Sequence, residues 1–435
     1  MTTIEELYDV FLHHPTICTD TRQLSPGCIF FALKGPSFNG NSFAEGALSA
    51  GAAFAVVDEQ QFAANPRCLL VKDVLEALQA LAHFHRKRLN IPVLAVTGSN
   101  GKTTTKELIR AVLSMKFRTL ATKGNLNNHI GVPLTLLSIT DEIEFAVIEM
   151  GANHQHEIES YCLYAEPDFG LITNVGKAHL EGFGGFEGVM KGKGELYRYI
   201  SSRRGMLFIN ADNEHLVSMA RERDAENKFT YGTGLDVDCK GELLAEQPFL
   251  KISWKCRDAQ GVVDSRLVGR YNFENILSAV AIGCYFGVPA EAIDVAIAAY
   301  APDNSRSQMI KLGSNEIVLD AYNANPTSME AAIRNFFEMK GINKIACIGD
   351  MAELGGETDV EHERIVKLLG EKAFSEVLLV GKSFGKFKEM LPCLHFEDSS
   401  QAAAWMNKNK PKDSLILIKG SRSTRMERLL EALEN

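Results

Sequence analysis

The stretch Leu94–Leu108, LAVTGSNGKTTTKEL, decides the fold, because it takes an apolar strand through two glycines into a helix. Phosphate-binding loops usually place four residues between the first Gly and the Gly-Lys-Ser/Thr that follows it. In this chain only two residues separate Gly98 from the Gly-Lys-Thr at 101–103, and Val96 stands where the usual first glycine would fall. The stretch is therefore either a shortened nucleotide loop or an ordinary glycine-rich turn.

The context of this loop favours nucleotide binding. Unpaired backbone N–H groups and the helix dipole make the N-terminus of a helix favourable for phosphate. Lys102 would supply a positive charge to the terminal phosphates, and Thr103 would supply a hydroxyl group to Mg²⁺. Because strand, glycines, lysine and threonines coincide, we predict a nucleotide site here rather than a plain turn.

The residues around the loop predict a parallel α/β domain. A strand at 91–96 precedes the loop, and the helix that follows it at 103–116 has apolar residues along one face. Further apolar strands alternate with helical or loop segments, at 144–150, 169–175 and 205–210. Strands that are apolar throughout and alternate with helices indicate a parallel sheet covered on both faces.

Three domains are predicted, in keeping with about 150 residues per domain. They cover residues 1–90, 91–303 and 304–435, with a polar, proline-bearing linker at 301–308. In the first domain we expect β-rich runs at 27–35 and 51–59 and a helix over 73–89. In the second we expect antiparallel strands within 239–270 and an amphipathic helix over 273–287. The third is a second α/β unit, with strands at 316–322, 344–350, 375–381 and 414–421 and helices from 327, 359 and 424.

Composition narrows the class of protein. Of the 435 residues, 46% are hydrophobic and 23% are charged, which is ordinary for a soluble globular chain. No window approaches the ~18 apolar residues of a membrane span, and the acidic first fourteen residues do not resemble a secretory signal. We therefore expect a cytoplasmic protein that does not insert into a membrane.

Charge and cysteine usage exclude further classes. The nine scattered cysteines include no C-x-x-C pair, which argues against a disulfide framework or a zinc knuckle. A net charge of −9 disfavours a nucleic-acid surface, so we expect no nucleic-acid partner. The basic run at 85–88 is interpreted as the solvated end of a helix.

Candidate chemistry also follows the other strands. Glu149 ends one predicted parallel strand, where open α/β sheets bind their ligands and where a carboxylate could hold Mg²⁺. His179 follows the next strand, and Lys191 and Lys193 lie in what reads as a glycine-rich turn. For these lysines the residue type leaves phosphate contact and plain exposure open. A zinc site at 154–157 is disfavoured, because no third ligand has suitable spacing.

Several motifs occur together in order and resemble those of the Mur ligases, the ATP-dependent amide-forming enzymes of peptidoglycan precursor synthesis. They are TGSNGKTT, EMGANH, TNVGKAH, KGELY, GRYNFENILSA, LDAYNANPTSM, GDMAELG and KGSRSTRME. Within that family the match is to the type that adds D-Ala-D-Ala. The resemblance spans nearly the whole chain, and Gly-x-x-Gly-Lys-Thr is this family's own version of the phosphate loop.

The resemblance implies an α/β fold of three domains. These are a small UDP-binding N-terminal domain, a central P-loop-type ATPase domain with a mostly parallel sheet, and a Rossmann-like C-terminal domain. It also implies two Mg²⁺ sites, with a CO₂-derived carbamate on Lys193. The implied nucleotide contacts are Gly98, Asn100, Gly101, Lys102, Thr103, Thr104, Asn275, Arg306 and Asp320, and the implied Mg²⁺ ligands are Thr103, Glu149, His179 and Lys193.

Catalytic roles are implied for Lys102, His179 and Lys193, and the partners implied are UDP-MurNAc-tripeptide and D-Ala-D-Ala, bound by a monomer. The implied substrate contacts are Thr21, Arg22, Gly35, Asn39, Asn127, Asn128, Tyr322 and Asn323. The chain departs from the family in three places. It has Ser305 where a glycine often precedes the arginine, a single acid, Asp320, before YNANP, and Asn-Gly-Asn at 39–41 where Asp-Gly-His is common.

The implied reaction activates a carboxylate as an acyl phosphate, which the amine then attacks. One alternative is another ligase of the same superfamily, adding diaminopimelate or lysine, or resembling folylpolyglutamate synthase. The Asp-Asn-Pro motif associated with diaminopimelate addition is absent from the third block, and folate enzymes lack a UDP-type first domain. A P-loop regulatory NTPase is an alternative of another class. A dinucleotide-binding dehydrogenase is disfavoured, because Lys-Thr occupies the place where the backbone must approach the cofactor.

Overall fold

The computed structural model describes residues 1–223, 225–302 and 305–434. Two compact units are formed, and β7 (Val93–Thr97) and β10 (Phe169–Ile172) contribute residues to both. The first unit comprises Met1–Val96, Phe117–Ala152 and His156–Gly170, and the second comprises Thr97–Lys116, Asn153–Gln155 and Leu171–Asn435. The predicted boundary between the second and third domains, at 303 and 304, lies outside the described residues.

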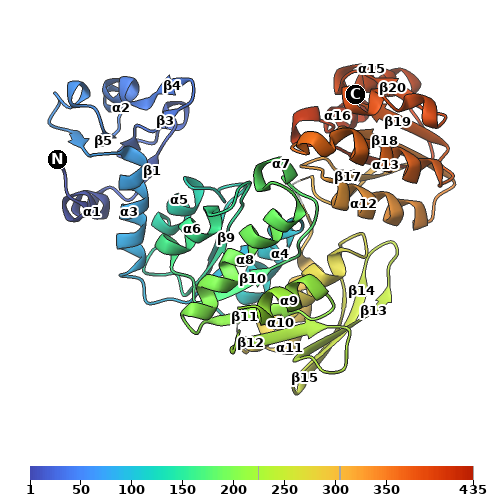
Figure 1. Cartoon of the computed structure of the whole chain (residues 1–435), viewed down its shortest axis with the longest axis horizontal. Helices are drawn as coiled ribbons and strands as arrows, with labels where there is room; N and C mark the ends of the chain where they lie inside the picture. The colour runs from blue at the N-terminus through green and yellow to red at the C-terminus, as the bar shows by residue number, and fades with distance from the viewer. Residues whose placement is uncertain (224, 303–304, 435) are drawn as a thin grey trace. The chain divides into compact units, whose positions relative to one another are not determined.

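The N-terminal part of the first unit contains a four-stranded parallel sheet in the order β1-β2-β5-β6 (Figure 1). Its strands are β1 (Ile17–Cys18), β2 (Ile29–Phe31), β5 (Phe54–Val57) and β6 (Cys68–Leu70), and its helices are α1 (Ile4–His13), α2 (Ala44–Ser49) and α3 (Val74–Arg86). A short antiparallel pair, β3 (Lys34–Gly35) and β4 (Phe38–Asn39), lies between β2 and β5 in the chain. The β-rich runs and the helix expected in this region are confirmed.

The interpretation of the basic run at 85–88 is wrong for its first two residues. His85 and Arg86 are both only 8% exposed. Arg86 donates hydrogen bonds to the backbone oxygens of Ala165 and Glu166, and Nε2 of His85 lies 2.8 Å from the carbonyl oxygen of Ile139. Backbone acceptors of other segments therefore satisfy polar groups that the local sequence assigns to solvent.

The central sheet is mostly parallel and runs in the order β15-β14-β13-β12-β11-β10-β7-β9-β8. Its other strands are β8 (Thr119–Ala121), β9 (Phe145–Glu149), β11 (Met206–Asn210), β12 (Lys228–Gly232), β13 (Cys239–Ala245), β14 (Lys251–Cys256) and β15 (Ala259–Asp264). The last two pairings, β13 with β14 and β14 with β15, are antiparallel, as predicted.

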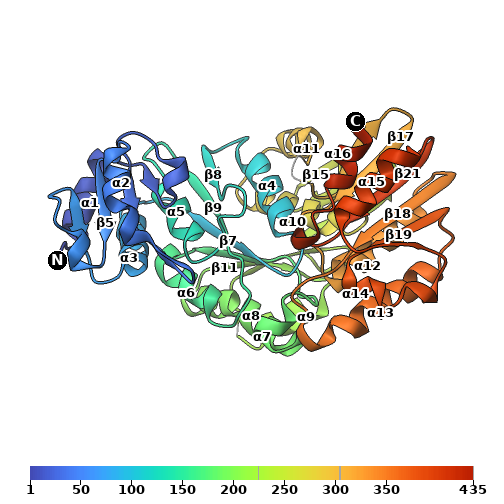
Figure 2. The same cartoon turned by 90° about the horizontal axis from the view of Figure 1, so that it is seen from above.

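Helices cover this sheet on both faces (Figure 2). The central helices are α4 (Lys102–Leu113), α5 (Gly131–Leu137), α6 (Glu157–Ala165), α7 (Leu180–Phe183), α8 (Phe186–Ser202), α9 (Glu214–Arg221), α10 (Asn272–Tyr285) and α11 (Ala290–Ala299). Helix α4 packs against α10 on one face, and α8 and α9 lie on the other. The predicted apolar face of α4 is buried.

Two local predictions in the central region are wrong. Lys191 and Lys193 lie within the long helix α8 rather than in a turn, and two of the three glycines of this helix pack closely against Phe183. The helix α10 is buried almost all round rather than amphipathic. Its polar residues Asn272 and Asn275 are buried yet hydrogen-bonded, which satisfies them without solvent.

The C-terminal part of the second unit is a six-stranded sheet in the order β16-β17-β21-β18-β19-β20. The strands are β16 (Gln308–Leu312), β17 (Asn315–Asp320), β18 (Asn343–Gly349), β19 (Glu376–Val380), β20 (Leu394–Phe396) and β21 (Ser414–Lys419), and only β16 pairs antiparallel among these described strands. The helices are α12 (Pro326–Glu338), α13 (Thr358–Gly370), α14 (Lys382–Gly385), α15 (Ser399–Asn409) and α16 (Arg428–Glu434). Helices α12 and α13 lie on one face, and α15 and α16 lie on the other (Figures 1 and 2).

The final helix begins at Arg428 rather than at 424, because a 3-10 turn at Arg422–Thr424 precedes it. None of the described helices is long and apolar enough to cross a membrane. The fold is α/β, with a large, mostly parallel central sheet between separate N-terminal and C-terminal sheets along the chain.

Candidate active site

The loop between β7 and α4 has a backbone that favours glycine at two positions. Gly98 has φ +143° and Gly101 has φ +77°, both in the left-handed half of conformational space. A Cβ on Gly98 would overlap Oγ1 of Thr173, and one on Gly101 would lie 2.6 Å from Oδ1 of Asn275. At both positions glycine suits the backbone conformation and leaves room for side chains of neighbouring segments.

Polar contacts hold the loop in place within the second unit. The backbone N–H of Asn100 donates to Oδ1 of Asn174 at 3.0 Å, and its carbonyl oxygen accepts from Oγ1 of Thr173 at 2.6 Å. The hydroxyl of Ser99 contacts the backbone of Gly176. The end of β10 and the residues after it thus fix the loop before any nucleotide is considered.

Lys102 and the threonines after it open helix α4. The ammonium of Lys102 folds back over the loop and donates to the carbonyl oxygens of Gly98 and Ser99, at 2.8 and 3.2 Å. Thr103 and Thr104 are buried, and no side chain caps this end of α4. An uncapped helix N-terminus with an adjacent ammonium is suited to an anion such as a nucleotide phosphate.

Asn275 joins this loop to the buried helix α10. Its Oδ1 accepts a 3.0 Å hydrogen bond from the hydroxyl of Thr105, and its Nδ2 donates to Asn272. The side chain also packs against Gly101. Asn275 therefore lies beside the phosphate loop and the first turn of α4.

Glu149 lies at the end of β9 in the first unit. It pairs with Val96, two residues before the first loop glycine, and its side chain is 1% exposed. Oε1 accepts a 2.7 Å hydrogen bond from Nδ2 of Asn127, whose neighbour Asn128 caps the start of α5 through the N–H groups of Ile130 and Gly131. A buried carboxylate at the carboxyl end of a parallel strand has the chemistry of an Mg²⁺ ligand.

His179 and Lys193 lie in the second unit. His179 has a left-handed backbone, with φ +53°, and Nδ1 of its ring contacts Oε2 of Glu353. The contact with the His179 imidazole lowers the pKa of Glu353 below that of a free glutamate. Lys193 is 1% exposed, and its ammonium lies 5.0 Å from the centre of the Phe183 ring.

Among the described residues, no three His, Cys, Asp or Glu side chains are clustered as a metal site. Glu149 and Thr103 offer the oxygen donors that Mg²⁺ prefers, a carboxylate and a hydroxyl, whereas His179 offers an imidazole nitrogen. Lys193 joins such a set only after its amine has become an anionic oxygen donor.

The region after the interdomain linker supplies further predicted contacts. The guanidinium of Arg306 stacks 3.8 Å from the centre of the Tyr322 ring, and its Nε is buried without a hydrogen-bond partner among the described residues. Ser305 has φ +56°, so it adopts the conformation that glycine often supplies at this place in the family. Asp320 accepts from the backbone N–H of Ser307 and pairs with the buried ammonium of Lys419.

The predicted UDP and peptide contacts lie in separate places. Asn39 caps a 3-10 turn and donates to Glu59, and it accepts from Asn41, which is fully buried against Asp58. Gly35 lies in β3, and Thr21 and Arg22 begin the short turn Thr21–Gln23. Asn323 is exposed and accepts from the backbone N–H of Ala324.

Three contacts in the second unit were missed by sequence reasoning. Nδ2 of Asn325 donates a 2.7 Å hydrogen bond to Oδ1 of Asn100 in the phosphate loop. Glu353 contacts His179, and Lys419 pairs with Asp320. The motifs AYNANP, GDMAELG and KGSR contain these residues, so the sequence marked their positions, but it did not indicate what they contact.

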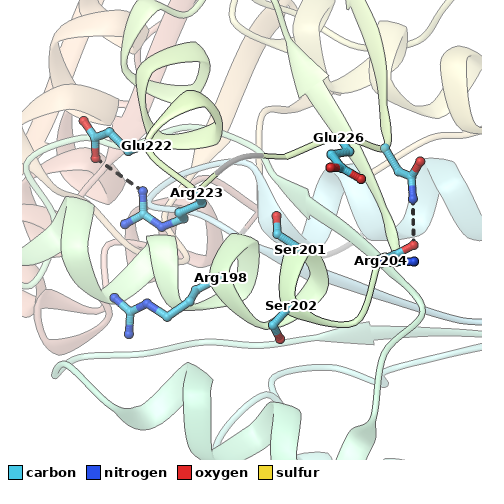
Figure 3. Close-up of a pocket in the computed structure, with 9 residues that line it drawn as sticks. Arg198, Ser201, Ser202, Arg204, Glu222, Arg223 and Glu226 are labelled. Carbon is cyan, nitrogen blue, oxygen red and sulfur yellow. Dashed lines mark hydrogen bonds and ion pairs between the residues drawn. The ribbon is translucent and has the colours of Figure 1, made fainter.

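A pocket of about 470 Å³ lies between the C-terminal end of α8 and the segment after α9 (Figure 3). Figure 3 shows Arg198, Arg204 and Arg223 around it, together with Glu222 and Glu226. None of the described residues that line it belongs to the predicted nucleotide or metal sets. The predicted chemistry is therefore not located in this pocket.

Together, the strand–loop–helix geometry and the parallel sheet define a nucleotide-binding α/β protein. Three family models match the chain: the Mur ligase family catalytic domain at residues 15–87, the Mur ligase middle domain at 96–283, and the Mur ligase glutamate ligase domain at 305–422. The chain therefore belongs to the Mur ligase family.

Relatives of known name match over nearly the full length. The chain is 37% identical to UDP-N-acetylmuramoyl-tripeptide–D-alanyl-D-alanine ligase of Escherichia coli, over 96% of this chain and 93% of that protein. It superposes on MurF from Acinetobacter baumannii with a TM-score of 0.87 at 31% identity, covering 96% and 93% of the two chains. It is also similar to MurF ligase from Thermotoga maritima in complex with ADP, with a TM-score of 0.85 at 26% identity and coverage of 96% and 97%.

Proposed function

We propose that this protein is the ATP-dependent ligase that joins D-Ala-D-Ala to UDP-MurNAc-tripeptide in peptidoglycan precursor synthesis. The observation that carries the proposal is the shortened loop at 98–103, with glycine geometry and a poised lysine, in a chain that matches the Escherichia coli ligase over 96% of its length. The ADP named with the Thermotoga maritima structure supports ATP as the nucleotide.

The proposed reaction activates a carboxylate, which is by itself a poor electrophile. A carboxylate resists attack by an amine, so the γ-phosphoryl group of ATP is transferred to the terminal carboxylate of the tripeptide, giving an acyl phosphate and ADP. The amine of D-Ala-D-Ala attacks the carbonyl carbon, the amide bond forms, and phosphate leaves. Phosphoryl transfer depends mainly on positioning and on neutralising charge, which is the role proposed for Lys102 and the first turn of α4.

Mg²⁺ is proposed to be held by Thr103, Glu149, His179 and a carbamylated Lys193. When bound, it would neutralise phosphate charge and polarise the carboxylate oxygen. The neutral amine of Lys193 would react with CO₂ to give a carbamate and one proton, which turns a buried cation into an anionic oxygen donor. The burial of Lys193 within α8 supports this assignment, because a fixed side chain can present such a donor in one place.

The remaining proposed contacts follow the parts of the two substrates. Asn275, Arg306 and Asp320 are proposed for the nucleotide, and residues of the first unit are proposed for the UDP-linked peptide. The buried, unpartnered Nε of Arg306 supports a role for this arginine toward an anionic group. We further propose that the protein acts as a monomer in the cytoplasm, with domain limits near residues 90 and 303.

A phosphate-release assay tests the function. ATP, UDP-MurNAc-tripeptide and D-Ala-D-Ala are supplied together, and each is then omitted in turn. Phosphate release should require all three, and mass spectrometry should find the pentapeptide product. Release that continues without the dipeptide would instead indicate a regulatory NTPase, and release with diaminopimelate, lysine or glutamate in its place would indicate another ligase of the superfamily.

The carbamate has its own test. Lys193→Ala should abolish activity, and short carboxylic acids such as formate or acetate should restore part of it by supplying the missing oxygen donor. Lys191→Ala, at an exposed position two residues earlier on α8, is the matched control and should keep wild-type activity. Absence of rescue in folded Lys193→Ala protein would count against the carbamate.

A further inference from the structure

The loop after β18 carries a carboxylate that faces His179. Oε2 of Glu353 contacts Nδ1 of the His179 ring, although the two residues are far apart in sequence. Glu353 is half-exposed and His179 is 21% exposed at the side chain. The contact therefore joins the C-terminal part of the second unit to the segment that follows β10.

The backbone on both sides is arranged for this contact. His179 has φ +53° and Glu353 has φ +63°, and non-glycine residues seldom adopt this left-handed conformation unless their surroundings hold them there. The loop is also in close contact with α7 beyond the side chains. A Cβ added to Gly355 would lie 3.1 Å from Cβ of Glu181.

The start of the loop is anchored by a buried polar network. The carboxylate of Asp350 accepts two hydrogen bonds of 2.9 Å from the backbone N–H groups of Ser383 and Phe384. The backbone N–H of Met351 donates at 3.1 Å to Nε2 of His362, which is fully buried. Glu353 thus follows closely after a fixed point of the fold.

A carboxylate on one ring nitrogen determines what the other can do. When Nδ1 carries the proton and donates it to a carboxylate, Nε2 keeps its lone pair and can bind a metal. In many metal sites such a carboxylate orients the histidine ring and raises its basicity. The contact between Glu353 and His179 likewise places a carboxylate at Nδ1 of the histidine ring.

We propose that Glu353 is a positioning residue, which holds His179 as the Nδ1–H tautomer and directs Nε2 toward the metal. This inference rests on the proposed function, in which His179 is an Mg²⁺ ligand. Because Glu353 comes from the C-terminal part of the chain, this support for His179 is present only when the loop 350–355 lies against α7. The loop therefore links the C-terminal part of the second unit to the proposed metal ligand His179.

Metal binding to the full-length protein provides the test. Mn²⁺ is titrated into protein saturated with ADP, and the free ion is measured by electron paramagnetic resonance. Loss of an outer carboxylate should weaken metal binding by roughly 10- to 100-fold in Glu353→Ala. Glu353→Gln keeps an oxygen acceptor for Nδ1–H. Its Mn²⁺ binding should therefore be weakened by less than half as much as in Glu353→Ala, on a logarithmic scale. Glu357→Ala, at an exposed glutamate just beyond this loop, should match the wild type.

The tautomer is read separately by NMR of protein with ¹⁵N-labelled histidine, with the His179 signals assigned through His179→Ala. Wild type and Glu353→Gln should show Nδ1–H, and Glu353→Ala should shift toward the other tautomer. An unchanged tautomer and unchanged Mn²⁺ affinity in folded Glu353→Ala would overturn the inference. So would tighter Mn²⁺ binding, because Glu353 would then compete with the metal. If His179→Ala also binds Mn²⁺ like the wild type, the proposed metal role of His179 itself fails.

Discussion

The side-chain amide of Asn325 donates a 2.7 Å hydrogen bond to the side-chain oxygen of Asn100, across 225 positions of sequence. Asn325 also caps α12, because its own side-chain oxygen accepts from the backbone N–H of Ser328. One residue thus begins a C-terminal helix and supports the phosphate loop of the central sheet.

The two tasks of Asn325 can be separated by substitution. Asn325→Ser keeps a good helix cap but cannot reach Asn100, so thermal stability should stay near wild type while KM for ATP rises roughly two- to tenfold, the effect of one lost hydrogen bond. Asn325→Ala should raise KM similarly and also lose about 1 kcal/mol of stability, because the cap is removed. Steady-state kinetics and thermal unfolding measure the two effects. Asn213→Ser, another cap exchange, should change neither; an unchanged KM in Asn325→Ser would show that the loop does not need this contact.

Gly98→Ala should remove nucleotide binding. The new Cβ would meet Oγ1 of Thr173, and φ +143° is strained for alanine by about 1–3 kcal/mol. We expect ATP affinity, measured by calorimetry, to fall at least tenfold in a protein that still folds. Gly313→Ala has a left-handed φ but nothing within 4 Å of the added Cβ, so it should lose some stability and keep ATP affinity. Equal affinities in the two variants would contradict the close-approach argument.

Acid should destabilise the first unit through His85. Burial lowers the pKa of His85 below its ordinary value of 6.5, so the unfolded chain binds the proton more readily than the folded one. Stability is therefore full above about pH 6.5 and falls as the pH drops below it, by up to about 1.4 kcal/mol per pH unit. Urea unfolding at pH 7.5 and pH 5.5 should show a smaller loss in His85→Gln than in the wild type. His215→Gln, at an exposed position, should keep the wild-type loss.

The buried carboxylate of Glu361 should matter more than either of its partners. Glu361 is 1% exposed and pairs with Lys177 at 2.5 Å and with Arg364 at 2.8 Å. Glu361→Ala removes the acceptor that both cations share and should cost about 1.5–3 kcal/mol of unfolding free energy, measured by urea titration, because both cations are partly exposed and Arg364 keeps Glu330. Lys177→Ala should cost much less, because Arg364 still compensates Glu361. Equal losses in the two variants would mean that Lys177 alone satisfies the carboxylate.

Sequence reasoning located the loop and the strand ends because these are local patterns. An apolar strand, two glycines, a lysine and a helical segment occur within fifteen residues, and the parallel strands place Glu149 beside Val96. Asn325 and Glu353 escaped assignment because their partners are distant in sequence, and nothing in the local pattern names them. The departure at Ser305 proved harmless to the backbone, since serine takes up the left-handed conformation there.

The pattern of polar residues gave a wrong prediction where hydrogen-bond acceptors that are distant in sequence bury polar side chains. His85 and Arg86 follow an amphipathic helix and precede two exposed basic residues, so their sequence context indicates solvent. Carbonyl oxygens at 139, 165 and 166 instead receive their donors. The same reason explains α10, in which Asn272 and Asn275 give an amphipathic appearance to a helix that is buried on nearly every side.

The folded-back ammonium of Lys102 has an energetic consequence for any ligand of the loop. Its contacts with the carbonyl oxygens of Gly98 and Ser99 are made within the loop, so a phosphate oxygen that binds this ammonium competes with them. The measured nucleotide affinity then reports how much better the Lys102 ammonium binds phosphate oxygens than the loop carbonyl oxygens. Removing Lys102 would consequently understate how strongly it attracts a phosphate, and it would also take away the intrinsic brace of the loop.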